Sequence, residues 1–255
     1  MNADDLQARI DAMGPWFYPF EFPHGIRTTS RLPESVVPIF TTRLEMVRRI
    51  VLEHFAGRLS ASTCLDIGCH EGFYTMAMAE AGFRRVMGLD ARETSLAKAR
   101  LVAEAFGRRE VEFLCADLEE AAPETIGEYD VVLLLGVLYH LANPMRCLRN
   151  VARLTRELLI VETQVVPDVE QVTEWGARTW SRPYQGVLAL IDESAERDAG
   201  SEETGLSGLV CCPSTRAVEA MLRSAGFRRV EIVPPPPGAY EQHRRGKRIV
   251  MKAYK

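Results

Sequence analysis

Three aspartates lie at the ends of short apolar runs, and their spacing is the clearest chemical signal in the sequence. Asp66 precedes a glycine in CLDIG, Asp90 ends GLD, and Asp117 directly follows FLCA. The carboxyl ends of parallel strands meet at one edge of an open α/β sheet, where such sheets bind ligands. Each aspartate taken singly is typical of a cap or a turn. Three of them at successive strand ends predict a ligand site.

A glycine-rich turn, GCHEG, follows Asp66 and contains Gly68, Cys69 and Gly72. Glycine lets the backbone turn tightly and approach a ligand that a side chain would block. Such a turn is weak evidence alone, because many unrelated loops contain one. Its position directly after an acidic strand end makes it a candidate cofactor loop.

The three carboxylates suit a cofactor that contains adenosine. Asp90 can accept hydrogen bonds from both hydroxyls of a ribose, as in dinucleotide-binding folds. Asp66 can organise the turn and receive a ligand ammonium, directly or through water, and Asp117 can receive an adenine amino group. The neighbours Ala91 and Leu118 are expected at the same site.

Strand and helix signals alternate from residue 63 onward. Apolar runs predict strands at 63–67, 85–89, 111–115, 129–135 and 157–162, with helical spacing at 72–81, 93–106 and 144–154. This rhythm predicts a doubly wound, Rossmann-like α/β fold whose parallel sheet is covered on both faces. A helix at 214–225 and strands at 229–233 and 248–253 complete it.

Two segments depart from this rhythm. Residues 1–60 combine an aromatic, proline-rich stretch with a helix over 40–55, and we expect an N-terminal lid followed by that helix. Residues 164–210 form an insert after the fifth strand, and a connection of this length is typical of a binding lid. We therefore expect a cofactor-binding domain over 61–255, with the insert as a substrate cap.

The bulk composition limits the classes of partner. The chain has 255 residues and a net charge of −4, whereas duplex nucleic acid needs clustered Lys and Arg. The N-terminus lacks the apolar core of a signal peptide, and the longest apolar run is strand-sized. Six cysteines contain no C-x-x-C pair. We expect a reduced, cytoplasmic protein with no metal site and no membrane span; the oligomeric state is not readable from the sequence.

Several segments resemble one enzyme family. LDIGCHEG (65–72), GLD (88–90) and DVVLLLGVLYH (130–140) resemble motifs of the class I S-adenosylmethionine-dependent methyltransferases. More narrowly, GVLYH with the following Asn143-Pro144 and LIVET (159–163) resembles the branch with tRNA wobble-uridine carboxymethoxy and methoxy methyltransferases. The resemblance covers residues 16–163 and 211–253.

The resemblance implies a seven-stranded sheet with its last strand antiparallel, and S-adenosylmethionine as the cofactor. It implies that Gly68, Cys69, Asp90 and Asp117 line the cofactor site. Gly136 is expected beneath the methionine portion. The family most often has glycine where this chain has His70, and a bulky residue there can partly cover the cofactor.

Methyl transfer is an in-line displacement, so the protein chiefly aligns the nucleophile and removes water. A general base is needed only where the nucleophile must lose a proton. Tyr139 and His140 follow the fourth predicted strand, and Glu162 ends the fifth, so all three are candidate catalytic residues. The alternatives are ring packing for Tyr139, a backbone hydrogen bond for His140 and a turn contact for Glu162.

Substrate contacts are expected from the lid, from the insert and from the last strand. The arginine of the last strand falls where some members of the resembled branch use an arginine to grip a carboxylate on a modified cofactor. The aromatic candidates compete with core packing and the charged lid candidates with plain surface positions. The candidates are Trp16, Tyr18, His24, Arg27, Trp175, Trp180 and Arg248.

We expect methyl transfer to an O or N nucleophile on a small metabolite or natural-product scaffold. The branch resemblance offers a tRNA wobble uridine as the alternative, but the acidic balance opposes it. An enzyme that directs other chemistry through the sulfonium would have the same loop. An NAD-dependent dehydrogenase could also use the glycine turn and Asp90, but it leaves Asp66 and the pair Tyr139–His140 without a task.

Overall fold

The computed structural model of the protein describes residues 1–121, 123–175 and 178–255, with side chains except at 173–181. The strands of the main sheet are β1 (Thr63–Ile67), β2 (Arg85–Asp90), β3 (Val111–Cys115), β4 (Tyr129–Leu135), β5 (Thr155–Gln164), β10 (Arg229–Val233) and β11 (Arg248–Tyr254). The helices are α1 (Ala3–Ala12), α2 (Pro38–His54), α3 (Phe73–Ala81), α4 (Glu93–Ala105), α5 (Pro123–Ile126), α6 (Pro144–Leu154), α7 (Ser194–Asp198), α8 (Thr215–Ser224) and α9 (Glu241–Arg244). Within these described ranges, no helix combines the length and apolar character needed to cross a membrane.

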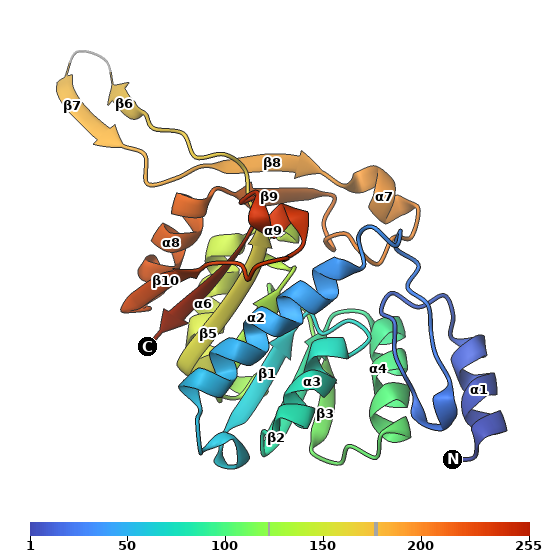
Figure 1. Ribbon diagram of the computed structural model, residues 1–255. Helices are drawn as coiled ribbons and strands as arrows, with labels where there is room; N and C mark the ends of the chain where they lie inside the picture. The colour runs from blue at the N-terminus through green and yellow to red at the C-terminus, as the bar shows by residue number, and fades with distance from the viewer. Residues whose placement is uncertain (122, 176–177) are drawn as a thin grey trace.

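The main sheet has the strand order β3-β2-β1-β4-β5-β11-β10, with helices on both faces (Figure 1). The strands β1 to β5 pair in parallel, whereas β11 runs antiparallel to both β5 and β10. The predicted doubly wound fold with an antiparallel last strand is therefore confirmed. The chain continues from β1 to β2 on one side and from β4 to β5 on the other. The carboxyl ends of the neighbouring strands β1 and β4 therefore leave a crevice in which a ligand can bind.

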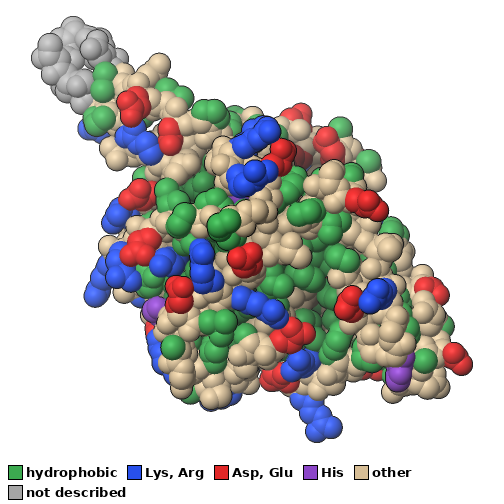
Figure 2. Space-filling model, in the orientation of Figure 1, with side chains coloured by type: hydrophobic (Ala, Val, Ile, Leu, Met, Phe, Trp, Pro, Cys, Tyr) green, Lys and Arg blue, Asp and Glu red, His purple; other side chains and the backbone are tan. Residues whose placement is uncertain are grey.

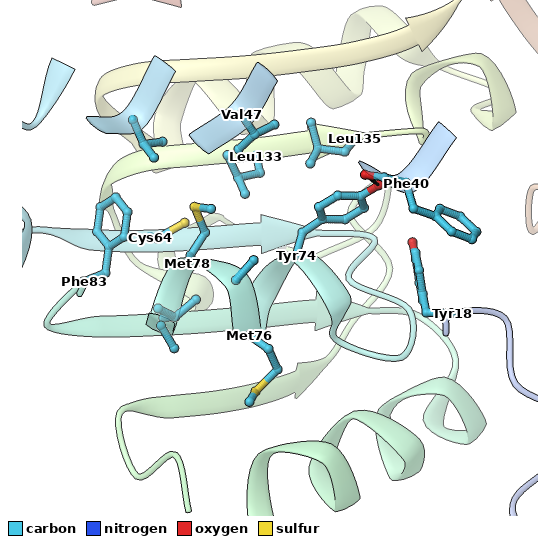
Figure 3. Packing of buried hydrophobic residues seen from close by; sticks show 14 of the residues in the cluster. Tyr18, Phe40, Val47, Cys64, Tyr74, Met76, Met78, Phe83, Leu133 and Leu135 are labelled. Atoms are coloured by element: carbon cyan, nitrogen blue, oxygen red, sulfur yellow. Dashed lines mark hydrogen bonds between the residues drawn. The ribbon is translucent and has the colours of Figure 1, made fainter. Parts of the chain in front are cut away.

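Successive residues of each strand point to opposite faces, so the sheet separates two hydrophobic cores. In β4, Leu133 and Leu135 join the core that contains α2, α3 and α4, whereas Leu134 joins the core under α6 and α8. Figure 3 shows part of the first core, in which Phe40 and Val47 of α2 belong with the β4 leucines. This packing fixes α2 across the sheet beside the crevice.

The N-terminal segment contains a helix that the sequence did not predict. Asn2 caps α1 by accepting a hydrogen bond from the backbone N–H of Asp5 at 2.9 Å. Only Leu6 and Ile10 of this helix are buried, at the four-residue spacing of one helical face. Two apolar positions among many charges are too weak a pattern to be recognised from sequence.

The insert after β5 contains two antiparallel ribbons and a short helix rather than an irregular connection. β6 (Val172–Trp175) pairs with β7 (Arg178–Pro183) in a hairpin that projects from the body of the molecule (Figure 1). β8 (Leu188–Asp192) pairs with β9 (Leu209–Pro213), and this second ribbon lies against the body of the molecule (Figure 1). Helix α7 and residues 199–208 return from β8 toward the crevice.

Candidate functional site

A cavity of about 250 Å³ lies at the carboxyl ends of β1 to β4. Its floor comes from the loops that follow these strands, and its walls come from the N-terminal segment, from α2 and from the insert. The residues that line it include Phe17, Tyr18, Arg43, Gly68, His70, Asp90, Ala91, Arg92, Asp117, Leu118, Glu119, Gly136, Val137, Tyr139, His140, Glu202, Glu203, Thr204, Gly205 and Arg248.

Two glycines give the cavity its floor. Gly68 (φ 71°) and Gly136 (φ 74°) have left-handed backbones that favour glycine. A Cβ on Gly68 would lie 2.3 Å from a methyl carbon of Val137, and one on Gly136 would lie 3.4 Å from the Arg43 guanidinium. The backbone thus comes close to the cavity at two points where a side chain would fill it.

Two of the predicted aspartates line this cavity. The carboxylate of Asp90 accepts hydrogen bonds from the backbone N–H groups of His70 and Arg92, both at 2.9 Å. Burial raises the pKa of Asp90 above its usual value, and these backbone contacts oppose the rise. Asp117 accepts from the backbone N–H of Glu119 at 2.9 Å. Both carboxylates are held in fixed positions at the crevice.

Three other predicted cofactor residues build the loop instead of lining the cavity. Asp66 is buried and accepts the hydroxyl hydrogen of Thr75 at 2.7 Å, and burial raises the pKa of Asp66 to about 6. The thiol of Cys69 is buried beneath the sheet residue Gly88. Gly72 begins α3, where a Cβ would lie 3.2 Å from Ala99. None of these three residues lines the cavity, and Asp66 organises the turn through Thr75, so their part in cofactor binding stays a prediction.

Glu162, a candidate base, lies outside the cavity lining. Its carboxylate is fully buried and lies 2.9 Å from Arg43, 3.2 Å from Arg248 and 3.1 Å from His243. Burial alone would raise the pKa of Glu162, but the two guanidinium groups and His243 hold it well below its usual range. A carboxylate so stabilised by cations has no tendency to take a proton, and it does not line the cavity.

Arg248 lines the cavity and has several partners of its own. Besides Glu162, it donates to the hydroxyl of Tyr139 and to the side-chain oxygen of Gln242, both at 2.9 Å. Arg248 therefore joins β11 to the turn after β4. Tyr139, a predicted catalytic residue, lies at the cavity with its hydroxyl accepting this bond.

Sequence reasoning missed Arg43, which is buried in α2 and lines the cavity. Its Nε atom is buried without a hydrogen-bond partner in the part of the chain that the structure describes. A signal was present, because Arg43 falls three residues after Phe40 and four before Val47, on the apolar stripe of the helix. A charged residue within such a stripe needs a buried partner or a ligand.

His140 lies in a 3₁₀ turn (Leu138–His140) shortly after β4, and it lines the cavity. Its Nδ1 atom is 2.7 Å from one carboxylate oxygen of Glu193 and 2.9 Å from the other. Burial lowers the pKa of His140, and the nearby Glu193 carboxylate partly opposes this. Glu193 comes from the insert and was not predicted, because nothing in the sequence links it to residue 140.

The N-terminal segment divides between core and cavity. Tyr18 lines the cavity, whereas Trp16 is buried in the core with its indole N–H donating to the Ile10 carbonyl at 3.0 Å. His24 is exposed, and Arg27 is exposed in an ion pair with Glu21. Trp16, His24 and Arg27 therefore do not line the cavity. Trp175 and Trp180 are on β6 and β7, and their side chains lie outside the described residues.

A buried carboxylate ties the N-terminal segment to the glycine-rich turn. Glu71 accepts hydrogen bonds from the backbone N–H groups of Phe17 (2.9 Å) and Tyr18 (3.0 Å), and Lys98 donates to it at 2.9 Å. His70, next in the turn, packs its ring 4.8 Å from that of Phe17. Burial lowers the pKa of His70 to about 3, so its ring is a neutral cover over the cavity.

The insert closes the opposite side of the cavity. Arg31 lies 3.3 Å from Glu202 and 3.4 Å from Glu203, and Arg92 donates to the Thr204 carbonyl at 2.8 Å. These contacts join the insert both to the N-terminal segment and to the loop after β2. Segments from three distant parts of the sequence thus meet over the cavity.

Comparisons with known proteins agree with this geometry. A methyltransferase domain model matches residues 65–158. The ubiquinone biosynthesis O-methyltransferase of Bordetella parapertussis is 37% identical over 176 residues, which are 65% of this chain and 72% of that protein. A tRNA U34 carboxymethyltransferase of Desulforapulum autotrophicum is 28% identical over 194 residues, 74% of this chain and 52% of that protein. The chain spans 43% to 72% of the length of its Bordetella relatives.

Among solved structures, the N-terminal domain of EvdMO1, crystallised in the presence of S-adenosylhomocysteine and D-fucose, is 26% identical. The match has a TM-score of 0.75 and covers 100% of this chain and 97% of that domain. The glycine floor, the strand-end aspartates and the sheet order are those expected for an adenosine-containing cofactor at a switch point. The chain belongs to the class I S-adenosylmethionine-dependent methyltransferases.

Proposed function

We propose that this methyltransferase acts on a small molecule enclosed in the cavity between the N-terminal segment and the insert. The observation that carries the proposal is this enclosure. Tyr18 and Phe17 lie on one side, residues 202–206 lie on the other, and Arg31 joins the two sides. A concave space under such a cover is typical of small-molecule sites.

Charge supports a small acceptor over tRNA. The insert residues at the cavity include Glu202 and Glu203, and Glu119 also lines it. These carboxylates would repel a phosphate backbone, which is bound through clustered Lys and Arg. Figure 2 shows basic and acidic side chains interspersed over much of one face, and the chain carries a net charge of −4.

The residues at the cavity fit the cofactor in kind. Gly68 and Gly136 would let it approach the backbone, Asp90 would receive its ribose hydroxyls, and Asp117 with Leu118 would face its adenine. Arg43, with its unpartnered Nε, would receive the carboxylate of the methionine portion, because a guanidinium fits a carboxylate. When bound, S-adenosylmethionine supplies an activated methyl group. The protein's task is to hold the acceptor in line with it and to exclude water.

Titration calorimetry with S-adenosylmethionine and S-adenosylhomocysteine tests the cofactor site. We expect both to bind the wild type, Asp90→Ala to weaken both strongly, and Asp11→Ala on the exposed face of α1 to change neither. Mass spectrometry of any ligand that copurifies would show what group the sulfonium carries. A carboxymethyl group would favour chemistry other than simple methyl transfer.

Labelled cofactor tests the acceptor. The protein is incubated with methyl-labelled S-adenosylmethionine and either bulk undermodified tRNA or a small-molecule extract. We expect label to enter low-molecular-weight products. Label in tRNA would contradict the proposal and support the relationship to the tRNA U34 carboxymethyltransferases instead.

A further inference from the structure

We infer that His140 is the general base that deprotonates a hydroxyl group of the acceptor, and that Glu193 of the insert is its positioning residue. The inference rests on the proposed function and deepens it, because it names the acceptor as an alcohol or a phenol. It also gives the insert a second task besides covering the cavity.

The geometry around His140 fixes one tautomer. A carboxylate can only accept, so the nitrogen that faces Glu193 at 2.7 Å carries the hydrogen. Nδ1–H therefore points to Glu193, and Nε2 keeps its lone pair. The structure gives Nε2 no hydrogen-bond partner among the described residues, while the ring lines the cavity. A neutral imidazole with a free Nε2 is in the form required of a base.

Glu193 is itself held by the insert. One of its carboxylate oxygens accepts the backbone N–H of Gly205 at 2.9 Å, and its own N–H donates to the Gly208 carbonyl at 2.6 Å. Gly205 crosses directly over the turn, since a Cβ there would lie 2.2 Å from the His140 carbonyl oxygen. The oriented base therefore exists only when residues 193–208 are seated on the cavity.

The charged groups around His140 keep it neutral near physiological pH. Burial lowers its pKa, Arg248 and Arg92 act in the same direction, and Glu193 opposes them. The Tyr139 ring lies 3.9 Å from the imidazole, and its hydroxyl accepts from Arg248. Glu162 is already paired with the guanidinium groups of Arg43 and Arg248. His140 is thus the group at this end of the cavity that is best prepared to take a proton.

The reaction balances without a further reagent. The acceptor O–H proton passes to Nε2 of His140, and an oxygen lone pair forms the new bond to the methyl carbon. The carbon–sulfur bonding pair remains on sulfur, which yields S-adenosylhomocysteine and an imidazolium that later loses its proton to water. Carboxylates and neutral amines can attack without this step, so the dyad points to a hydroxyl.

The tautomer can be measured without a substrate. In 15N-histidine spectra of the complex with S-adenosylhomocysteine, we expect His140 to show the Nδ1–H tautomer, the less common form. The signal is assigned among the five histidines by its loss in His140→Gln. Glu193→Ala should shift it toward the usual Nε2–H form, whereas Glu196→Ala, an exposed position in helix α7, which Glu193 directly precedes, should not. An Nε2–H tautomer in the wild type would overturn the inference.

Kinetics supply the second arm, with simple phenols and alcohols set against simple carboxylic acids as probe acceptors. We expect methylation of hydroxyl acceptors, with kcat about 100-fold lower in Glu193→Ala and KM little changed. The acid limb of the pH profile should move to lower pH in that variant, because the carboxylate that raises the His140 pKa is gone. Turnover of carboxylic acids alone would overturn the inference while leaving the proposed function intact. Failure of the wild type to bind the cofactor would instead refute the proposed function.

Discussion

Arg43 and Glu162 form a buried ion pair that joins α2 to the carboxyl-terminal end of β5. The guanidinium and the carboxylate are 2.9 Å apart. Neither side chain exposes more than 7% of its surface. The same carboxylate also neutralises Arg248, so two cations at the cavity share one buried anion. This buried cluster therefore carries more positive than negative charge at one end of the cavity.

Glu162→Gln tests the structural weight of this network. Removing the anion leaves two buried guanidinium groups without a counter-charge, and breaking a buried pair in this way costs about 3–5 kcal/mol of unfolding free energy. The matched control is Glu80→Gln. It breaks the exposed pair with Arg48, which lies in α2 like Arg43, and should cost at most ~1 kcal/mol. Urea unfolding of both variants gives the comparison, and equal losses would contradict it.

Gly68→Ala tests the floor of the cavity. Both Gly68 and Gly57 have a positive φ, so alanine at either position pays a strain of about 1–2 kcal/mol. Only at Gly68, of these two, would the new Cβ meet a side chain, a Val137 methyl at 2.3 Å. We expect Gly68→Ala to weaken S-adenosylhomocysteine binding at least tenfold in calorimetry. Gly57→Ala should keep the wild-type affinity, and loss of binding in both would refute the role of close approach.

Asp66 predicts a pH dependence of stability. Its pKa of about 6 in the folded protein exceeds the value of an exposed aspartate, so the folded state binds its proton more tightly. A raised carboxyl pKa means that this residue's contribution to stability falls as pH rises from about 4 to about 6, by about 3 kcal/mol in all. Above that range its unfavourable contribution is constant.

The test compares wild type with Asp66→Asn, which cannot ionise and can still accept from Thr75. Urea unfolding at several pH values between about 4 and 7 gives the free-energy difference. We expect the variant to gain stability relative to the wild type as pH rises through this window. A difference that is independent of pH, or of the opposite sign, would show that burial does not disfavour the ionised form of Asp66.

Arg31→Ala tests how the cavity is covered. Losing the contacts to Glu202 and Glu203 should let the insert open more often, so amide hydrogen exchange over residues 202–206 should speed up several-fold. Dissociation of S-adenosylhomocysteine should become faster as well. Arg27→Ala, which breaks the exposed pair with Glu21, is the control and should change neither rate.

The fold was predictable because its signals are local. Strand length, helical spacing and turn residues identified the sheet and its strand ends, including Asp90 and Asp117. The sequence did not reveal that Asp90 lines the cavity whereas Asp66 is buried outside its lining. Asp90 is the last residue of β2, whereas Asp66 is followed by Ile67 within β1, so its carboxylate turns under the sheet toward Thr75.

The remaining site residues depend on contacts between distant parts of the chain. Glu162 ends the predicted fifth strand, where a catalytic base could lie. Arg43 of α2 and Arg248 of β11 instead pair with its carboxylate, which gives it a structural role. Glu193 lies in an insert without helical or strand periodicity, and only folding brings it to His140. The buried position of Trp16 was not readable for the same reason, since its partner Ile10 belongs to a helix with a weak pattern.

The hydrogen bonds from Phe17 and Tyr18 to Glu71 have a consequence for dividing the protein. A chain shortened to begin at residue 61 would retain every strand of the sheet. It would also leave the Glu71 carboxylate, at 0% exposure in the intact chain, without its two backbone donors. The turn that carries Gly68 would then lose its support from outside. Phe17 and Tyr18 therefore both line the cavity and hold the turn that forms its floor, and a chain that begins at residue 61 would lack both contributions.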